Sequence, residues 1–504
     1  MQPILVLLAL PIIILILYYK KHSRNTDHEK KPQPPSPPGL PIVGNLFQFD
    51  AKYPHICLWR LSQKYGPIMS MKLGFRRVVV ISSSDVVKEI MKSHDLTFSS
   101  RPIMKGLQKL SYNGLDLGFS PYNDSWRELR KISTLHLFSL RKVNSFRPIR
   151  EEEVSRMIKK ISEDACQSKI INLSEVMISL TSNITCRAAF GKSYGDEGFE
   201  KSRFFNLLRE AQAMLVALYL SDYFPWLGWI DKISGMDARL DKIFWDLDSF
   251  YDELIEEHFD SKRPASMRGD MLDVLLELKR DKATPMDLTM ENIKGVIMNV
   301  FAGGTDTSAA ALVWAMTALM QNPSIMKKAQ AEIKALLTET NKDFIDEDDI
   351  AKLPHLRAIV KETMRLYPST PLLAPRETIQ KCTINGYEIL PGTLVHLNAW
   401  AVARDPEIWK DPEEFFPERF LGSDIDVRGR DPEVIPFGIG RRGCPGAPMA
   451  IASVELAMAN LLYKFNWEMP PGMKNEDIDY DVVPGITMHK KNALCLMAKP
   501  AVHA

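Results

Sequence analysis

The sequence predicts one large, mainly α-helical domain with a minor β part, preceded by a transmembrane helix at the N-terminus. Three observations support this fold class. Most of the chain has apolar residues three and four positions apart, only a few short runs alternate as strands do, and residues 1–19 carry no charge. The 504 residues, 45% hydrophobic and 25% charged, have the composition of a globular protein.

The N-terminal run at residues 1–19 is followed directly by the cations Lys20, Lys21 and Arg24. As a helix it would span roughly 28 Å, close to a hydrocarbon core of about 30 Å. A cleaved signal peptide, the competing interpretation, needs positive charge before the run and a small-residue cleavage site after it, and the sequence has neither. We therefore expect a membrane anchor whose basic flank faces the cytoplasm.

Residues 20–45 combine that basic flank with a proline-rich stretch. Proline fixes φ and removes the backbone donor, so the stretch should be stiff and extended. We expect a spacer between membrane and body, with an SH3-type ligand as the less favoured alternative. The folded body is expected to run from residue 46 to residue 504 without an internal linker.

The body is expected to be helical, with two β-hairpins. The hairpins are predicted at 68–73 with 77–81 and at 387–390 with 394–397, the second around Pro391 and Gly392. Helices are predicted where good helix formers carry the helical period, at 152–165, 204–219, 240–259, 325–337 and 356–366.

The longest helix is predicted at 289–321, and its middle is unusual. Gly303 and Gly304 together cost roughly 1 to 2 kcal/mol relative to alanine, and the four polar residues 305–308 prefer caps to helix interiors. Such a departure is expected where function outranks stability. A glycine kink where another helix packs closely is the alternative that this segment leaves open.

Several functional classes are excluded by what the sequence lacks. The six cysteines form no C-x-x-C pair, which indicates a reducing compartment. Zincin, α/β-hydrolase and Walker motifs are absent. A net charge of +1 supplies no general attraction for nucleic acid.

The segment around Cys444 carries the clearest chemistry. Glycines 438, 440 and 443 permit a tight turn, and Pro445 opens a helical run that lasts to about Phe465. A cysteine at this position faces the positive end of a helix, which favours the thiolate. The pattern indicates a soft anionic ligand for iron, although a lone cysteine is usually a small core residue.

This segment resembles the haem-thiolate cytochrome P450 family, whose signature F-x-x-G-x-R-x-C-x-G is met by Phe437, Gly440, Arg442, Cys444 and Gly446. The resemblance covers essentially the whole chain and is most like the plant microsomal branch of specialised metabolism. It implies the P450 fold and haem b with the Cys444 thiolate as axial metal ligand. Two supporting motifs also match, E-x-x-R at Glu362 and Arg365 and P-E-R-F at Pro417, Glu418, Arg419 and Phe420.

The unusual middle of the long helix, A-G-G-T-D-T-S, fits the family's oxygen-activating pattern. The resemblance implies that Asp306 and Thr307 are its acid and alcohol, which relay protons. It also implies that a haem propionate is bound by Trp126 and Arg130 of W-x-x-x-R, and that further cofactor-binding residues are Arg376, Phe437 and Arg442.

The function implied is a membrane-bound monooxygenase of the endoplasmic reticulum, with its catalytic domain in the cytoplasm. It would insert one atom of O2 into a hydrophobic plant metabolite such as a terpenoid, alkaloid, phenylpropanoid or oxime. No NADPH or flavin motif is present, so electrons would come from an NADPH-cytochrome reductase, with cytochrome b5 as a further partner. Docking contacts are expected at Arg127, Lys131 and Arg441, for which a solvated charged face is the alternative.

Substrate choice is expected to rest on segments 98–123, 205–214 and 369–374, on the centre of the long helix, and on 485–488. Two other functions remain open, a haem-thiolate isomerase or dehydratase that works without O2 and a non-catalytic membrane scaffold. The apolar residues expected at the substrate are Leu117, Phe119, Val300, Leu372, Leu373 and Ile486.

Overall fold

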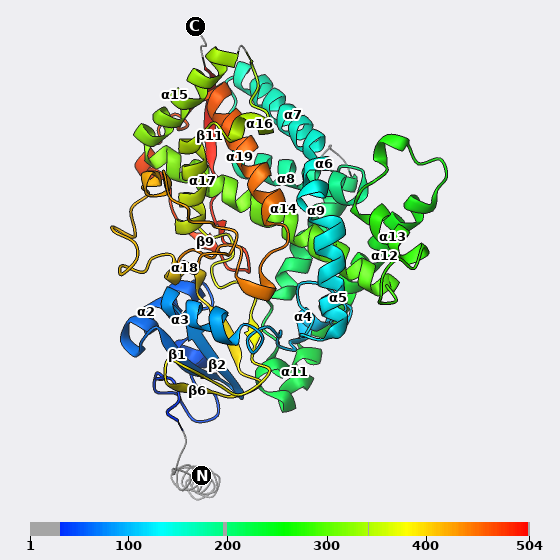
Figure 1. Ribbon diagram of the computed structural model, residues 1–504, viewed down its shortest axis with the longest axis vertical. Helices are drawn as coiled ribbons and strands as arrows, with labels where there is room; N and C mark the ends of the chain where they lie inside the picture. Colours follow the sequence, from blue (N-terminus) through cyan, green and yellow to red (C-terminus); the bar gives the residue numbers. More distant parts are fainter. Residues whose placement is uncertain (1–30, 195–198, 341, 502–504) are drawn as a thin grey trace, which may run out of the picture.

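The computed structural model describes residues 31–194, 199–340 and 342–501 (Figure 1). The predicted anchor at 1–19 and the basic flank up to residue 30 lie outside these residues. Within them, helices dominate and strands are few and short, as expected. The helices are α2 (Pro54–Tyr65), α3 (Ser84–Glu89), α4 (Lys105–Leu110), α5 (Asp124–Ile132), α6 (Leu140–Ser145), α7 (Arg147–Cys166), α8 (Leu173–Phe190), α9 (Phe199–Leu215), α10 (Leu220–Tyr223), α11 (Gly228–Ile233), α12 (Met236–Phe259), α13 (Met271–Arg280), α14 (Met290–Gln321), α15 (Pro323–Thr340), α16 (Glu347–Ile350), α17 (Pro354–Leu366), α18 (Ala399–Val402) and α19 (Ala447–Lys464).

The predicted helices are present, with shifted ends. The helix expected at 204–219 ends at Leu215, so residues 216–219 lead into α10 as irregular chain. The longest helix, α14, begins one residue later than expected because Thr289 is its cap. The Thr289 Oγ1 accepts from the Asn292 N–H (3.2 Å), and the Asn292 Oδ1 accepts from the Thr289 N–H (3.1 Å).

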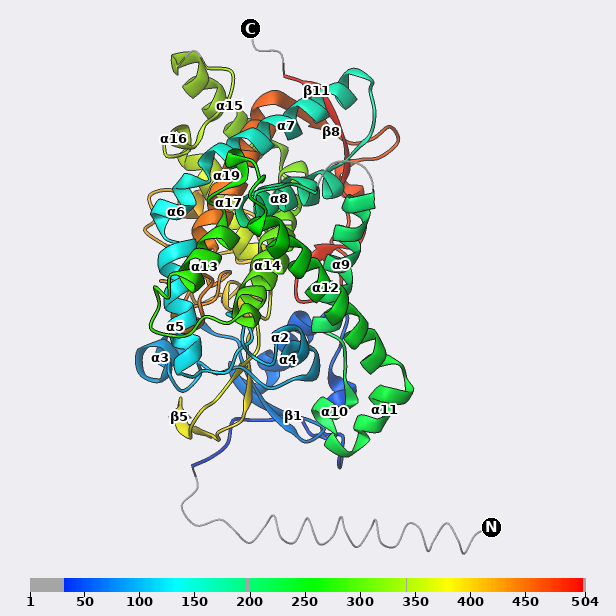
Figure 2. The same ribbon diagram turned by 90° about the vertical axis from the view of Figure 1, so that its right-hand side faces the viewer.

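Helix α14 forms the centre of the helical region (Figures 1 and 2). Its residues 292–298 and 308–320 are all buried. Among the described helices it alone is long and apolar enough to cross a membrane, but 67% of its most apolar stretch is buried inside the protein. It is therefore a core helix.

The adjacent glycines Gly303 and Gly304 of α14 have different structural reasons. A Cβ at Gly304 would lie 3.0 Å from Thr185 of α8, and the Thr181 hydroxyl of α8 donates to the Thr305 carbonyl (2.7 Å). Close helix packing therefore explains Gly304. A Cβ at Gly303 would meet no atom within 4 Å, because this residue faces a cavity.

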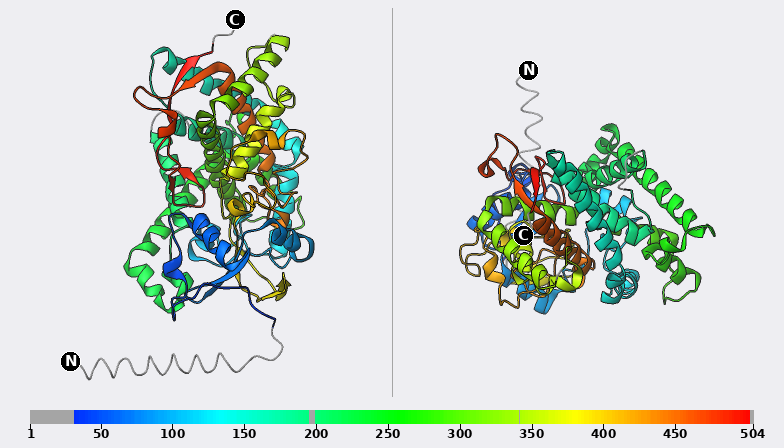
Figure 3. Two further views of the ribbon diagram at one scale, coloured as in Figure 1. Left: turned by 90° about the vertical axis from the view of Figure 1, so that its left-hand side faces the viewer. Right: turned by 90° about the horizontal axis from the view of Figure 1, so that it is seen from above.

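The main sheet lies at the end of the molecule opposite β11 (Figure 3). Strand β1 pairs antiparallel with β2, with Ile68 opposite Ile81, as the first predicted hairpin requires. Strand β7 runs parallel to β2, and β4 is antiparallel to β7. The strands of this sheet are β1 (Ile68–Leu73), β2 (Arg76–Ile81), β7 (Leu394–Leu397) and β4 (Arg376–Glu377). Smaller sheets contain β3 (Ile171–Asn172), β11 (Cys495–Pro500) and β8 (Phe465–Glu468), then β5 (Cys382–Ile384) with β6 (Tyr387–Ile389), and β9 (Val482–Val483) with β10 (His489–Lys490).

The second predicted hairpin is wrong in its pairing. The strands exist, but β6 pairs with β5, not with β7. Asn385 and Gly386 have φ of 46° and 80°, the values of a two-residue turn that favours Asn-Gly. After Pro391 the chain crosses to the main sheet, where the Gly392 N–H donates to the Thr378 carbonyl (2.8 Å).

The described part of the proline-rich segment lies along the edge strand β1. The Ser70 N–H donates to the Pro35 carbonyl (2.8 Å), and the Asn45 Oδ1 accepts from the Lys72 N–H (2.8 Å). These bonds hold residues 35–45 against the body of the protein.

Candidate active site

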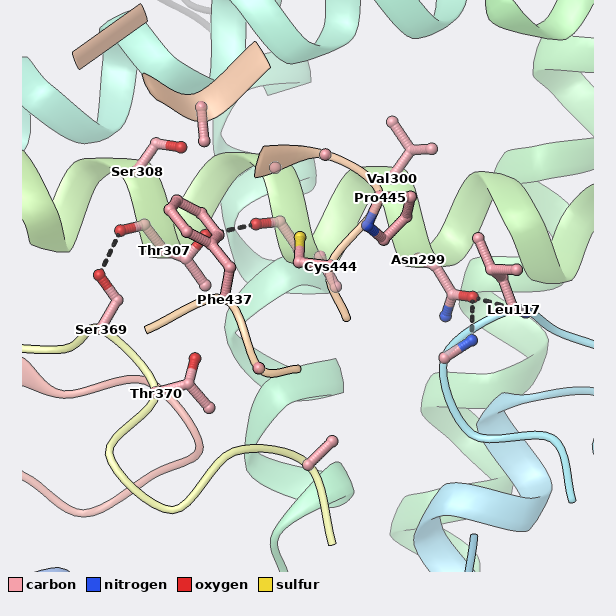
Figure 4. A pocket seen from close by; sticks show the side chains of 18 of the residues that line it. Leu117, Asn299, Val300, Thr307, Ser308, Ser369, Thr370, Phe437, Cys444 and Pro445 are labelled. Carbon is pink, nitrogen blue, oxygen red and sulfur yellow. Dashed lines mark hydrogen bonds between the residues drawn. The ribbon is translucent and has the colours of Figure 1, made fainter. Parts of the chain in front are cut away.

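A large cavity lies between α14 and the Cys444 segment (Figure 4). Its volume is about 380 Å³. This lies within the range of about 300–1,000 Å³ that is typical of small-molecule sites. The predicted residues that line it are Leu117, Phe119, Trp126, Arg130, Val300, Thr307, Leu373, Arg376, Phe437, Arg442, Cys444 and Ile486.

Two predicted residues do not line the cavity. Leu372 packs instead against the apolar cluster beside the main sheet, which includes Leu58 and Leu394. Asp306 is buried on α14 but outside the cavity lining. From the segment 205–214 only Gln212 reaches the cavity.

The segment that carries Cys444 is shaped by glycines. Gly438 and Gly440 have φ of 70° and 69°, and a Cβ at Gly440 would lie 2.3 Å from the Asp95 carboxylate. The Cys444 N–H donates to the Phe437 carbonyl (2.8 Å), which closes the loop just before α19. The loop therefore presents the Cys444 side chain to the cavity (Figure 4).

The Cys444 thiol is open to the cavity yet lies deep in the protein. Its depth raises the pKa of Cys444 above the ordinary value, while the N–H groups of Gly446 and Ala447 and the Arg130 guanidinium oppose the rise. The helix start thus acts in the expected direction but is outweighed by burial. A bound metal cation would reverse this balance, because it deprotonates a coordinating thiol.

Arg101, Arg376 and Arg442, which are buried, and Arg130, which is half-buried, line one end of the cavity with their guanidinium groups. Burial and mutual repulsion lower the pKa of Arg442 to about 8 and that of Arg101 to about 9. The Nη1 atoms of Arg376 and Arg442 are buried without a partner among the described residues. Such unpaired cations fit an anionic ligand.

This donor set fits the two propionates of haem. Arg442 stacks on Trp126 with 3.7 Å from guanidinium carbon to ring centroid, and Arg130 donates to the Gly443 carbonyl (2.7 Å). Arg376 donates to the Ile439 carbonyl (2.6 Å) beside the cysteine loop. The cationic end of the cavity is therefore bonded directly to the loop that carries the thiol.

Arg101 was missed by sequence reasoning. It donates from Nε to the Gly118 carbonyl (2.9 Å) and from Nη1 to the Ala374 carbonyl (2.6 Å). Its only sequence signal is a cation after the buried run at Phe98, in the stretch F-S-S-R-P. Burial beside the other arginines is a tertiary feature that this stretch does not reveal.

The middle of α14 presents Thr307 and Gly303 to the cavity. The Thr307 hydroxyl donates to the Gly303 carbonyl (2.7 Å), and the Ser369 hydroxyl donates to the Thr307 carbonyl (2.8 Å), as Figure 4 shows. Thr307 therefore offers its hydroxyl oxygen to the cavity. Asp306, the second predicted catalytic residue, instead meets His489 of β10.

The E-x-x-R motif forms a buried charge cluster. Arg365 makes a two-pronged pair with Glu362 (2.7 and 2.9 Å), and both side chains are inaccessible to solvent. Arg419 adds a third contact from Nε to Glu362 Oε1 (3.1 Å). The cluster joins α17 to the segment that contains Pro417–Phe420 and leads towards the cysteine loop.

The three residues expected to contact a reductase each have an acidic neighbour. Arg127 pairs with Asp124 (2.6 Å), and Arg441 pairs with Asp95 (3.3 Å). Lys131 lies 3.9 Å from Glu128. All three remain more than half exposed, so their charge is available at the surface.

The family profile described as "Cytochrome P450" matches residues 34–497. A 5-OH-xanthotoxin synthase of Pastinaca sativa is 48% identical over 99% of both chains. Strychnine-11-hydroxylase of Strychnos nux-vomica is 44% identical over 97% of this chain and 95% of its own. A zebra fish cytochrome P450 solved with progesterone superposes with a TM-score of 0.75 at 25% identity, covering 89% of this chain and 99% of that chain.

Proposed function

The chain belongs to the cytochrome P450 family, and from this premise we propose that Cys444 is the haem ligand of an enzyme that hydroxylates an aromatic plant metabolite of the coumarin type. The chain is a P450 monooxygenase of plant specialised metabolism, and its family carries haem b with a cysteine thiolate ligand.

One observation carries the assignment of Cys444. Of the six cysteines, all within the described residues, it alone lines the cavity. Trp126, Arg130, Arg376 and Arg442 would hold the propionates, and Phe437 would pack against the ring. When bound, haem with a thiolate ligand supplies the chemistry of O2 cleavage and oxygen-atom transfer.

The overall reaction joins one oxygen atom to a substrate carbon and reduces the other to water, so it consumes two electrons and two protons. In the proposed mechanism, the Thr307 hydroxyl is the proton donor at the cavity wall. It bonds the carbonyl of Gly303, a residue that has no side chain to fill the neighbouring space. Asp306, which contacts His489, passes protons on to Thr307. The electrons would come from NADPH through a separate reductase that docks near Arg127, Lys131 and Arg441, with cytochrome b5 as a second donor.

The substrate class is supported by the cavity and by the relatives. Leu117, Phe119, Val300 and Ile486 contribute apolar side chains to the cavity lining, which suits a hydrophobic ring system. Relatives named for xanthotoxin, trihydroxycoumarin and strychnine chemistry are 44–48% identical to this chain. A coumarin is therefore the first substrate to test, with an alkaloid second.

A membrane location is supported by an exposed apolar face. Trp226, Trp229 and Ile233 are 57%, 56% and 78% exposed around α11, and Phe75 packs on Trp226 with 4.4 Å between ring centroids. Helix α11 and strand β1 lie at the same end of the molecule (Figure 2). Tryptophans on such a face are typical of contact with a membrane interface. We propose that this face rests on the endoplasmic reticulum beside the anchor at 1–19.

The test is expression in microsomes with a reductase, a reduced carbon-monoxide difference spectrum, and product analysis with xanthotoxin under 18O2. A thiolate-type band and one labelled oxygen in the product are expected. Product formed without O2 or reductase would indicate the isomerase alternative. A loaded protein that turns over no coumarin or alkaloid would contradict the proposed substrate class and favour the scaffold.

A further inference from the structure

One wall of the cavity is a short irregular segment, residues 115–120, that lies across α14. Leu117, Gly118 and Phe119 of this segment line the cavity. A Cβ at Gly295 of α14 would lie 3.1 Å from the Asp116 backbone, so the helix and the segment are in close contact. Any substrate that fills the cavity must fit the position of this wall.

Asn299 of α14 bonds the segment with its side-chain amide (Figure 4). The Oδ1 accepts from the Leu117 N–H (2.9 Å) and the Gly118 N–H (2.8 Å), which uses both of its lone pairs. The Nδ2 donates to Asp116 Oδ2 (2.8 Å). The amide orientation follows from these partners, because only an oxygen can face two N–H groups and only an N–H can face a carboxylate. Asn299 therefore lines the cavity, but its side-chain amide is already hydrogen-bonded to residues 116–118.

Asp116 completes the arrangement from inside the segment. Its side chain is inaccessible to solvent, and Oδ1 accepts from the Phe119 N–H (2.9 Å) and the Ser120 N–H (2.8 Å). Burial raises the pKa of Asp116, and these bonds together with Asn299 oppose the rise. Four backbone N–H groups of the wall are therefore satisfied by two side chains, which also bond each other.

The opposite side of the segment is held by residues of the proposed haem site. Arg101 donates to the Gly118 carbonyl (2.9 Å), and Arg442 donates to the Ser120 carbonyl (2.6 Å). The Trp126 indole N–H donates to the Leu117 carbonyl (2.9 Å). The wall is fixed between α14 and the cationic end of the cavity, so its shape depends on both.

We propose that Asn299 and Asp116 form a latch that holds residues 115–120 as a rigid wall, and that Asn299 is a positioning residue for substrate size selection and not a hydrogen-bond donor to the substrate. This inference rests on the proposed function for its ligand measurements, but not for the rigidity of the wall.

The test uses two single variants and their combination. Asn299→Asp places two carboxylates against each other, and Asp116→Asn places two amide N–H groups against each other or turns one towards backbone donors. In the double variant the amide and the carboxylate exchange places. The new carboxylate then accepts from Leu117 and Gly118, and the new amide accepts from Phe119 and Ser120 and donates across the pair. Every bond of the latch is restored, and only the bond between residues 116 and 299 reverses its direction.

Two readouts follow the wall in the haem-loaded proteins. Hydrogen–deuterium exchange of peptides covering 115–120 should be faster by about tenfold in each single variant and return to the wild-type rate in the double variant. Spectral titration with a bulky azole such as clotrimazole should show about tenfold weaker binding in the single variants. Imidazole, which is too small to reach the wall, should bind all variants alike.

Ser308→Ala is the matched control, because Ser308 lines the same cavity on the same helix and has no hydrogen bond to residues 115–120 in the described structure. It should leave exchange of the wall unchanged. Unchanged exchange in both single variants, or a double variant as mobile as the single ones, would overturn the latch. A wild-type protein without a thiolate spectrum would overturn the proposed haem function while the exchange result still decides the latch.

Discussion

The carboxylate of Asp306 lies against the imidazole of His489, with 2.6 Å between Oδ1 and Nε2. Asp306 is buried, so this contact places a buried carboxylate within ion-pair distance of an imidazole nitrogen. Asp306 belongs to α14, and His489 follows the cavity-lining Thr487 by two residues on the C-terminal hairpin. Asp306, the residue expected to deliver protons, is thus held in place by His489, which does not line the cavity.

Replacing His489 should impair proton delivery more than substrate binding. In His489→Phe the buried carboxylate of Asp306 loses its partner, so we expect product formed per NADPH to fall by about tenfold. Hydrogen peroxide should rise in proportion, while the spectral dissociation constant for substrate changes less than about twofold. Lys491→Gln, which alters an exposed pair with Asp481 on the same hairpin, should leave the ratio unchanged. Unaltered coupling in His489→Phe would refute a role in proton delivery.

Thr307→Ala should uncouple electron consumption from product formation. The variant loses the hydroxyl that bonds the Gly303 carbonyl on the cavity face of α14. We expect product per NADPH to fall at least tenfold with the carbon-monoxide spectrum intact. Thr307→Ser keeps the hydroxyl and should recover most of the coupling. Full coupling in the alanine variant would contradict the proton relay.

Cys444→Ala should abolish the thiolate-type carbon-monoxide band. Cys186→Ala and Cys495→Ala are controls, since Cys186 is buried in the apolar core and Cys495 lies on β11, both away from the cavity lining. Both should keep the band at full intensity per folded protein. A band that survives in Cys444→Ala and disappears in either control would reverse the ligand assignment.

Glu362→Gln should destabilise the protein strongly. The change leaves the buried guanidinium of Arg365 without its counter-charge, and breaking such a pair costs about 3–5 kcal/mol of unfolding free energy. Glu418→Gln removes a more exposed pair with Lys328 and should cost about 1 kcal/mol or less. Urea unfolding followed by circular dichroism measures both. Equal effects of the two changes would show that burial of the Glu362 pair is unimportant.

Stability should fall below neutral pH partly through His55. Burial, with a smaller effect of the nearby Arg404, lowers the pKa of His55 to about 4. Because the unfolded residue titrates near 6.5, its contribution is complete above that pH and is lost as the pH falls towards 4, at most about 3 kcal/mol. His55→Gln should flatten this part of the stability profile, whereas the exposed His136→Gln should not. An identical pH profile for His55→Gln and the wild type would contradict the assignment.

The local elements of this protein could be read from its sequence. The β1–β2 hairpin, the long helix and the cysteine loop each depend on signals within a few residues, namely alternation, helical period and glycines at positive φ. The P450 resemblance also identified Cys444, Thr307 and the arginines Arg130, Arg376 and Arg442 as site residues. All five line the same cavity in the structure.

Only the tertiary structure decided which distant segments meet. Strand β7 pairs with β2 and not with its neighbour β6, Leu372 turns away from the cavity, and His489 lies against Asp306. Arg101 and Asn299 gain their roles from partners far apart in the chain, such as Ala374 and Asp116. The physical reason is that burial and pairing depend on long-range contacts, whereas periodicity and turn propensity act only between near neighbours in the sequence.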